Sequence, residues 1–395
     1  MNIVLFDEPL TRTELLPFTF TRPLAKIRVG ILTIDEKWSK WLTGQPSFLT
    51  EAYLSAKFPV IQSTDNLLIN GALCPDENLV RAVKGLYNGT ALVQKGVRLA
   101  IRSESTSLAQ FEKAKHIEYE GNITLIDQVW KIFQHNAAQL RIDFKLITAG
   151  RKSQGVQDKH TIRYNEENIF VEEGVAIRAA VLNAEDGPIY LGKNSVIQEG
   201  ALIKGPFALC EGSHVNMGGK MRGDSTIGPY SKVGGEISNS VIFGFSNKAH
   251  DGFLGNSVLG EWCNLGADTN TSNLKNNYEN VKIWSYAKGG FADTGLQFCG
   301  LMMGDHSKAG INTMFNTGTV VGVSANIFGD GFPRTFIPSF AWGGASGFST
   351  FQLSKAFDTA TKVMARRNLT LDETEKSVLK HIFESTAGNR IWEKK

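Results

Sequence analysis

The chain has 395 residues, enough for two domains, and its 42% hydrophobic and 21% charged content is ordinary for a globular protein. Lys and Arg (42) nearly balance Asp and Glu (39), which argues against a nucleic-acid partner. Four cysteines without paired spacing indicate reduced thiols, and no apolar run reaches membrane length. Because the N-terminus also lacks a signal-peptide pattern, we expect a cytoplasmic protein without a membrane partner.

The first 150 residues alternate between short apolar stretches and amphipathic ones. This alternation predicts an α/β, Rossmann-like domain with a mainly parallel sheet. The polar stretch that follows, 151–168, is expected to be a linker. Strands are expected at 1–6, 66–71 and 90–94, and helices at 31–42, 75–86 and 123–147, the last being one helix or two.

From 169 to 345 a large apolar residue recurs every six positions, with a small residue four places later. A period of six fits neither a helix nor a flat strand. It predicts a triangular prism with three hexads per coil, an all-β left-handed parallel β-helix. Glycines at the second place, such as Gly192 and Gly228, are expected to permit tight turns. The first apolar run consists of Leu191, Ile197, Ile203, Leu209, Val215, Met221, Ile227 and Val233.

The six-residue period fails at 235–246 and at 270–300. After the solenoid, residues 346–395 form a helical tail with helical stretches at 351–368 and 371–386. The second stretch carries acidic residues in its first turn, as helix starts prefer. The tail is expected either to cap the end of the solenoid or to cover the cleft of a neighbouring subunit.

His250 follows the first interruption, at the fourth place of a hexad and near a corner, so its ring is expected to point outward. A neutral imidazole there could accept a proton from an amine that attacks a thioester. Asn273 or backbone N–H groups could stabilise the oxyanion, and Lys248, Lys275 and Lys282 offer cations for a phosphate. A groove for the acyl donor would form between parallel prisms, which predicts a homotrimer.

Simpler explanations exist for these residues. His250 could only cap a corner, and Lys275 and Lys282 could be solvated loop charges. His214 and His306 could join His250 in a three-histidine metal site, although the spacing of these histidines does not favour such a site.

The stretch KAHDGFLGNSVLGEWCNLGADTNTSNL resembles the acetyltransferase domain of bifunctional N-acetylglucosamine-1-phosphate uridylyltransferase/glucosamine-1-phosphate N-acetyltransferases. The resemblance covers nearly the whole chain and is closest to an alternative bacterial branch of that family. It implies that His250 and Asn273 are catalytic and that Lys282 binds the substrate phosphate. Phe253, a further substrate-binding candidate, stands where the family has Tyr.

The downstream stretch MGDHSKAGINTMFNTGTVVG (303–322) resembles the family's next coil, which helps to bind acetyl-CoA. The resemblance implies acetyl-CoA contacts at Lys308, Asn312 and Thr313.

Near the N-terminus, TRTELLPFTFTRPLAKIRVG (11–30) resembles the signature of sugar-1-phosphate nucleotidyltransferases. The family's Gly-rich loop is replaced by DEPLTR, and Leu24 stands where its lysine is expected. Ala72 replaces a magnesium-binding Asp, which leaves Asp76 or Asp7 as candidate ligands. The resemblance implies a nucleotide site at Arg12, Arg22, Lys26 and Arg28, or these arginines only hold a degenerate domain together.

Together these patterns predict a transferase of amino-sugar nucleotide synthesis. The solenoid would transfer acetyl from acetyl-CoA to glucosamine 1-phosphate or a related hexosamine 1-phosphate. The α/β domain would couple the product to UTP with Mg²⁺, giving UDP-N-acetylglucosamine. Two alternatives stay open: a nucleotidyltransferase whose solenoid only oligomerises or regulates, and a non-catalytic protein that binds sugar nucleotides.

Overall fold

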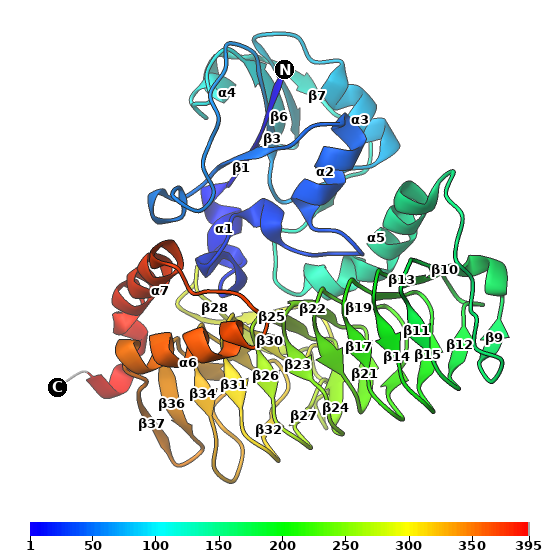
Figure 1. Ribbon diagram of the computed structural model, residues 1–395. Coiled ribbons are helices and arrows are strands. Elements are labelled where there is room, and N and C mark those ends of the chain that lie inside the picture. The colour runs from blue at the N-terminus through cyan, green and yellow to red at the C-terminus, as the bar shows by residue number, and fades with distance from the viewer. Residues whose placement is uncertain (394–395) are drawn as a thin grey trace. The chain divides into compact units, whose positions relative to one another are not determined.

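The computed structural model describes residues 1–393 and contains an α/β unit followed by a parallel β-solenoid and a helical C-terminal segment (Figure 1). The chain divides into two compact units. The first unit comprises Met1–Leu15, Thr21–Ile27 and Leu32–Gln128. The second comprises Leu16–Phe20, Arg28–Ile31 and the chain from Val129 on. The predicted fold class is confirmed in its α/β, solenoid and helical parts.

The first unit is built on a six-stranded sheet in the order β2-β1-β3-β6-β5-β7. The sheet is mainly parallel, as predicted, and β6 alone runs antiparallel to its neighbours, because β5 turns directly into β6 through Lys95 and Gly96, both left-handed. Such a two-residue turn produces an antiparallel hairpin. The strands are β1 Asn2–Phe6, β2 Ser47–Leu49, β3 Asn66–Asn70, β5 Thr90–Gln94, β6 Val97–Ser103 and β7 Lys115–Glu118, with the small pair β4 Leu73–Cys74 and β8 Thr124–Leu125. The helices are α1 Pro9–Glu14, α2 Ile34–Leu42, α3 Glu77–Lys84 and α4 Gln110–Lys113.

The solenoid has three faces, each a parallel sheet in which every strand pairs with the equivalent strand of the next coil. The nine-stranded face contains β10 Ile169–Val171, β13 Ile189–Leu191, β16 Phe207–Leu209, β19 Ser225–Ile227, β22 Val241–Gly244, β25 Val258–Glu261, β30 Met302–Met303, β33 Val320–Val321 and β35 Phe336–Ile337. The ten-stranded face contains β11 Ala176–Ile177, β14 Val196–Ile197, β17 His214–Val215, β20 Lys232–Val233, β23 Asn247–Lys248, β26 Asn264–Leu265, β31 Lys308–Ala309, β34 Asn326–Ile327, β36 Ala341–Gly344 and the antiparallel β37 Gly347–Thr350. The six-stranded face contains β9 Ile162–Tyr164, β12 Val181–Asn183, β15 Leu202–Lys204, β18 Lys220–Met221, β21 Glu236–Ser238 and β24 Phe253–Gly255, and the pair β27 Asn270–Thr271 and β32 Met314–Phe315 lies beyond it.

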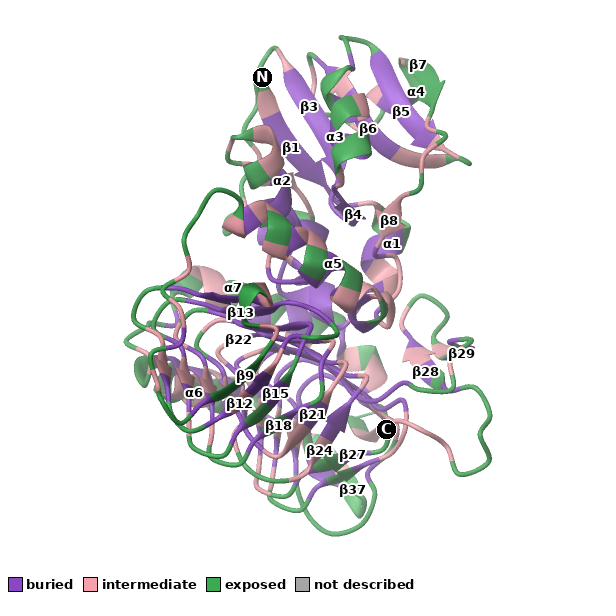
Figure 2. Ribbon diagram, turned by 90° about the vertical axis from the view of Figure 1, so that its right-hand side faces the viewer, coloured by how far each residue is buried: buried purple, intermediate pink, exposed green. Residues whose placement is uncertain are grey.

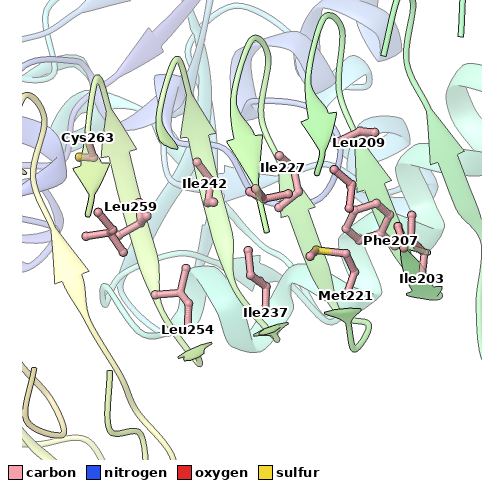
Figure 3. Packing of buried hydrophobic residues seen from close by; sticks show 14 of the residues in the cluster. Ile203, Phe207, Leu209, Met221, Ile227, Ile237, Ile242, Leu254, Leu259 and Cys263 are labelled. Atoms are coloured by element: carbon pink, nitrogen blue, oxygen red, sulfur yellow. The ribbon is translucent and has the colours of Figure 1, made fainter. Parts of the chain in front are cut away.

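The core of the solenoid is the set of apolar residues that point inward from all three faces (Figure 3). All eight residues of the first predicted apolar run are buried, with at most 2% of their surface exposed. Ile227, Ile242 and Leu259 continue one such row on the nine-stranded face. The hexad pattern thus correctly predicts which residues fill the prism.

The glycines at the second place of the hexad serve a different purpose from the predicted one. None of Gly192, Gly228 or Gly260 has a positive φ, so they do not supply left-handed turns. Instead, the backbone of the next coil passes directly over them. At Gly192, for example, a Cβ would lie 2.7 Å from the amide nitrogen of Glu211. These glycines therefore set the close spacing of successive coils.

The two interruptions of the hexads have opposite structural causes. Val215 and Val233 stack 18 positions apart, whereas Val233 stacks on Lys248 only 15 positions later. The first interruption is thus a shortened coil that keeps its three faces. The second is an insertion whose chain leaves the coils and forms an antiparallel hairpin, β28 Lys282–Ser285 and β29 Gly290–Asp293 (Figure 2). The hairpin packs back on the solenoid, because Trp284 of β28 stacks on Phe336 of β35 at 4.1 Å between ring centroids.

Two segments expected outside the solenoid belong with it. Helix α5 (Lys131–Thr148), predicted within the first domain, groups with the second unit. On this helix the buried Asn136 and Asp143 accept hydrogen bonds from the backbone N–H groups of Gly30 and Ile31. Strand β9, within the expected linker 151–168, pairs with β12 and starts the solenoid.

The C-terminal segment packs on its own solenoid. Helix α6 (Leu353–Ala365) buries Ala356, Ala360 and Met364 along one face. Helix α7 (Glu373–Ser385) starts at Asp372, whose carboxylate accepts from the Glu375 N–H. The ring of Phe383 contacts Phe340 at 5.0 Å between centroids. The tail therefore packs on its own solenoid, with α7 against the last coils and the end of α6 beside β20 and β23.

No helix within residues 1–393 is both long and apolar enough to cross a membrane.

Replacing Gly192 with Ala tests the spacing role of these glycines. The added Cβ would force the backbone at Glu211 to move, and overpacking of this kind costs about 1–3 kcal/mol. We expect the melting temperature of Gly192→Ala to fall. Gly290→Ala is the matched control, because its Cβ would meet no atom within 4 Å. Equal stability of the two variants would contradict the role assigned to Gly192.

Candidate functional site

His250 lies at the corner between β23 on the ten-stranded face and β24 on the six-stranded face, and it is exposed, as predicted. No protein group within residues 1–393 is seen to hydrogen-bond to its ring. The ring therefore faces solvent and can meet a substrate. This is the arrangement that a general base needs before its ligand binds.

Side chains hold the backbone of the His250 corner from behind. The Asn216 amide donates to the carbonyl of Ala249 at 2.8 Å. The Lys248 ammonium donates to the carbonyls of His250 at 2.6 Å and Asp251 at 2.7 Å. Three successive carbonyls are thus fixed by hydrogen bonds, and charge-assisted bonds such as those of Lys248 are among the stronger ones. The corner is rigid although the imidazole is free.

Lys248 does not lie where the sequence suggested. We expected a substrate-binding side chain, but Lys248 takes the inward position that Val233 holds in the preceding coil, and it is fully buried. Burial lowers the pKa of its ammonium to about 8, an effect that the nearby Asp251 and Asp268 partly offset. With its Nζ bound to backbone carbonyls, Lys248 supports the corner instead of contacting a substrate.

A surface cavity of about 630 Å³ lies on one side of His250. It is formed by the ten-stranded face and the C-terminal end of α6. Three cations line it: Lys232 from β20, and Arg366 and Arg367 from the end of α6. The side-chain oxygen of Asn247, also in the lining, is buried and accepts no hydrogen bond. This side of His250 suits an anionic group.

A second cavity, of about 550 Å³, lies on the other side of His250. Its lining includes Asp251 and Asp268, which occupy the same corner in successive coils. No Lys or Arg of the described chain contributes to this lining. This side therefore suits a cationic group, and His250 stands between sites for opposite charges.

An aromatic column runs along the corner beside the cationic cavity. Tyr230, Phe245 and Trp262 stack in successive coils, with ring centroids 5.3 and 4.3 Å apart, and His306 continues the column at 6.2 Å. All four have left-handed backbones, with φ between 53° and 62°. Bulky residues rarely adopt this conformation, and the stacking helps to offset its cost. Phe245 and Trp262 give the cavity a flat apolar wall.

Asn273 and His250 are not brought together. The Asn273 amide donates to the side-chain oxygen of Asn256 at 2.8 Å, at the corner that follows β24. His250 occupies the corner that precedes β24. The three residues of this strand separate the corners, and Asn273 lines neither of the two cavities beside His250. A joint role in catalysis stays a prediction.

The remaining candidates for substrate binding lie near β24 and in the inserted segment. Phe253 begins β24 and is half-buried, its N–H bound to the side chain of Asn270 at 2.8 Å. Lys275 is half-buried in the insertion, and Lys282 is exposed at the start of β28. None of the three lines either of the two cavities beside His250.

The residues expected to bind acetyl-CoA lie two coils beyond the His250 corner. The Lys308 ammonium donates to the carbonyl of His306 at 2.9 Å, and burial lowers its pKa. The Thr313 hydroxyl is buried and bonds to the carbonyl of Gly310, whereas Asn312 is exposed at a corner. Of the three, Asn312 alone presents its side chain to solvent.

The alternative of a histidine-based metal site finds no matching geometry. Within residues 1–393 no group of three or more His, Cys, Asp or Glu side chains is placed to hold a metal ion. His306 instead belongs to the aromatic column, and burial lowers the pKa of His214.

The predicted nucleotide-binding cations of the first unit have structural partners. Arg12 is buried and donates to the Asp7 carboxylate at 2.7 Å, and Lys26 pairs with Asp35 at 2.7 Å. The carbonyl of the buried Arg22 accepts a further bond from Arg12. These contacts show that Arg12, Arg22 and Lys26 help to hold the fold, whatever else they bind.

Arg28 belongs to the second unit. Its guanidinium is buried and donates to the carbonyl of Phe243 at 3.1 Å and to the carbonyl of Ile31. Both acceptors are backbone atoms of the second unit. Arg28 is thus a packing residue of the solenoid unit in the structure.

A cavity of about 650 Å³ lies in the first unit, where Asp7 and Thr50 follow the ends of the parallel strands β1 and β2. Ligands commonly bind at this edge of a sheet. Carboxylates and hydroxyls dominate its polar lining, including Glu51, Glu104 and Ser105, and none of its described lining residues is cationic. It is the best-formed candidate for a sugar or nucleoside in this unit.

The donor set of the first unit does not fit a magnesium ion. Asp7 already binds Arg12, Thr50 and the Leu24 N–H through its two oxygens. Burial raises the pKa of Asp7 in spite of these partners. Asp76 caps α3 by accepting from the Leu79 N–H at 2.9 Å. Neither carboxylate is placed to bind Mg²⁺.

Comparison with known proteins relates both parts of the chain to transferases. Residues 3–152 match the family model described as sugar nucleotidyl transferase. The bifunctional sugar-1-phosphate nucleotidylyltransferase/acetyltransferase of Sulfurisphaera tokodaii is 26% identical over 283 residues, which cover 68% of this chain and 63% of that protein. The bifunctional protein GlmU of Methanocaldococcus jannaschii is 33% identical over 87 residues, 22% of this chain and 21% of that protein. The chain is thus similar, at modest identity, to proteins that carry both a sugar nucleotidyltransferase and an acetyltransferase name.

The matches with these two relatives span less than two thirds of the relatives' own length. The putative uncharacterized acetyltransferase YaiX of Escherichia coli is 25% identical over 171 residues, 43% of this chain and 71% of that protein. PerB from Caulobacter crescentus, solved with CoA and GDP-perosamine, aligns over 89% of this chain and 97% of its own. Its TM-score of 0.14 and identity of 8% establish no likeness.

Sequence reasoning found His250 but missed several residues around it. Asn216 precedes it by almost two coils, and Arg366 and Arg367 lie more than 100 positions later. Only the fold brings them to the corner. One signal was present in the sequence: an adjacent arginine pair at the end of the first helical stretch of the tail.

The buried position of Lys248 predicts a particular pH dependence. Its folded-state pKa of about 8 lies below the ordinary 10.5, so between these values the unfolded chain binds more protons. Stability contributed by Lys248 therefore rises with pH across this window. We expect the melting temperature of the wild type, relative to Lys248→Met, to increase from pH 8 to pH 10. A difference that stays constant or falls would contradict the lowered pKa that burial gives Lys248.

Proposed function

We propose that the protein is a bifunctional transferase whose solenoid acetylates the amine of a hexosamine 1-phosphate, with His250 as general base and acetyl-CoA as donor. The α/β unit would then couple the N-acetylated product to a nucleotide, giving UDP-N-acetylglucosamine when the sugar is glucosamine and the nucleotide UTP. We place this reaction in the cytoplasm. The observation that carries the proposal is the exposed His250 between a cationic and an acidic cavity.

The two cavities match the charges of an amino-sugar phosphate. At neutral pH the amine of such a sugar is largely protonated, and the carboxylates of Asp251 and Asp268 would attract it. The phosphate of a ligand would favour the side of Lys232, Arg366 and Arg367. His250 lines both cavities and can therefore reach a nitrogen placed between them.

In the acetyl transfer, the bound ammonium first gives up its extra proton to solvent, and the lone pair of the neutral amine nitrogen then attacks the thioester carbonyl carbon. A nitrogen–carbon bond forms, the carbon–sulfur bond breaks, and the electron pair of that bond leaves on sulfur. The proton lost by the amine passes to His250 and from there to the CoA thiolate. Because Lys248 and Asn216 fix the backbone of the corner, the imidazole is held in place for this transfer.

For the α/β unit, the match to the sugar nucleotidyl transferase model supports nucleotidyl transfer. The cavity beside Asp7 is the candidate position for the sugar nucleotide. No step is assigned to Mg²⁺, because Asp7 and Asp76 are committed to other partners. The homotrimer predicted from the solenoid would add a groove between neighbouring prisms for acetyl-CoA, and sedimentation of the full chain tests that assembly.

His250→Gln tests the proposal directly. With glucosamine 1-phosphate, acetyl-CoA and UTP as substrates, we expect the wild type to form both the acetylated sugar and the sugar nucleotide. The variant should lose about 10²–10⁴-fold in the rate of acetylation, the usual contribution of a general base. Nucleotidyl transfer to N-acetylglucosamine 1-phosphate should not change.

His160→Gln is the matched control, because His160 is an exposed histidine at the start of the same solenoid. It should acetylate as fast as the wild type. Undiminished acetylation by His250→Gln would refute the role of His250. A wild type that transfers nucleotide but neither binds nor uses acetyl-CoA would support the alternative in which the solenoid only oligomerises or regulates.

A further inference from the structure

The end of helix α6 brings an unpaired group of positive charges to the catalytic corner. Lys232, Arg366 and Arg367 line the cavity beside His250, and none of them forms an ion pair with a described residue. Lys232 and Arg367 are half-buried, and Arg366 is exposed. Three cations from two distant parts of the chain thus converge where the structure supplies no compensating carboxylate.

The electrostatics of the group confirm that its charges repel one another. Burial and the neighbouring Arg366 lower the pKa of Arg367. Burial, Lys232 and Arg367 likewise lower the pKa of His214, which lies next to Lys232 on the ten-stranded face. No carboxylate contributes to either shift. An anion in this cavity would relieve the repulsion.

A purely structural reason explains only part of this arrangement. Arg366 is the residue at which α6 ends, and a cation at a helix C-terminus interacts favourably with the helix dipole. That effect does not account for Lys232, which comes from β20. It also does not account for the cavity, which includes the catalytic corner and the aromatic wall of Phe245 and Trp262.

We propose that Arg366 and Arg367, with Lys232, bind a phosphoryl or pyrophosphoryl group of the ligand that places its reacting group at His250. The proposal rests on the proposed function for the identity of that ligand, but not for the existence of an anion site. Planar guanidinium groups bind phosphate oxygens in pairs, and two adjacent ones suit a phosphate or pyrophosphate. The helical tail would thus be part of the acetyltransferase site.

Two sources could supply the phosphoryl group: coenzyme A, through its pyrophosphate or its 3′-phosphate, or the acceptor sugar 1-phosphate. The aromatic wall of the cavity is compatible with the adenine of coenzyme A, whereas a sugar phosphate would need only the cations. The cations would bind a phosphoryl group in both cases. Experiment therefore has to decide between coenzyme A and the acceptor sugar.

The test measures binding to the full chain by calorimetry, with pyrophosphate, coenzyme A, 3′-dephospho-coenzyme A and glucosamine 1-phosphate as separate probes. The variant is Arg366→Ala/Arg367→Ala. We expect it to bind pyrophosphate at least about tenfold more weakly than the wild type, because each lost charge-assisted hydrogen bond is worth about that factor. Binding by the wild type should weaken as salt is added.

Lys362→Ala is the matched control, since Lys362 is an exposed cation one turn earlier on α6 and does not line the cavity. It should bind all four probes as the wild type does. Melting temperatures of both variants report on folding. A double variant that is less stable yet binds every probe as tightly as the wild type would overturn the proposal, because the arginines would then serve the helix alone.

The probes also identify the ligand. Weaker binding of both forms of coenzyme A assigns the site to the pyrophosphate of the donor, and weaker binding of coenzyme A but not of its dephospho form assigns it to the 3′-phosphate. Weaker binding of glucosamine 1-phosphate assigns it to the acceptor. Failure of the proposed function would show separately, as undiminished acetylation by His250→Gln or as no acetylation by the wild type. The pyrophosphate result stands in either case.

Discussion

The stacking of coils in register is the constraint on which the rest of the solenoid depends. Each strand pairs with its equivalent in the next coil, so a coil of a different length must still place its residues in the same rows. The coil from Val233 to Lys248 is three residues shorter than the one before it. It therefore places a lysine in an otherwise apolar inward row, and that charge must find partners inside the prism.

The hydrogen-bond partners of Lys248 lie at the corner that carries His250, so the stacking of the coils affects the candidate site. The Lys248 ammonium has backbone carbonyls within reach at the adjacent corner, and it binds those of His250 and Asp251. The irregular coil thus makes the corner rigid at the place where an imidazole faces solvent. On either side lie cavities of opposite charge, one of them completed by the arginines of α6. The shortened coil thus supplies the lysine that fixes the backbone of the His250 corner.

The sequence predicted what depends on local periodicity. Rows such as Ile227 and Leu259, the strand at 66–71 and the helices around 34–42 and 77–84 follow from spacing and end signals. It could not predict what depends on pairing across coils. The six-residue period loses its register at the short coil, and the sequence therefore predicted Lys248 to lie at the surface. The role of Gly192 follows from the approach of the next coil, and the position of Arg367 depends on how α6 docks. The Lys95–Gly96 turn is a local sequence signal for the antiparallel hairpin of β5 and β6.

The central claim is that the His250 corner and the end of α6 form one acyl-transfer site. A crystal structure of the full chain soaked with coenzyme A and glucosamine 1-phosphate tests this claim most directly. The expected result places the CoA sulfur and the sugar amine within about 3–4 Å of each other, with the amine beside the His250 imidazole. It also places a phosphate against Arg366 and Arg367. Ligands bound at another corner of the solenoid, with His250 left in solvent, would contradict the claim.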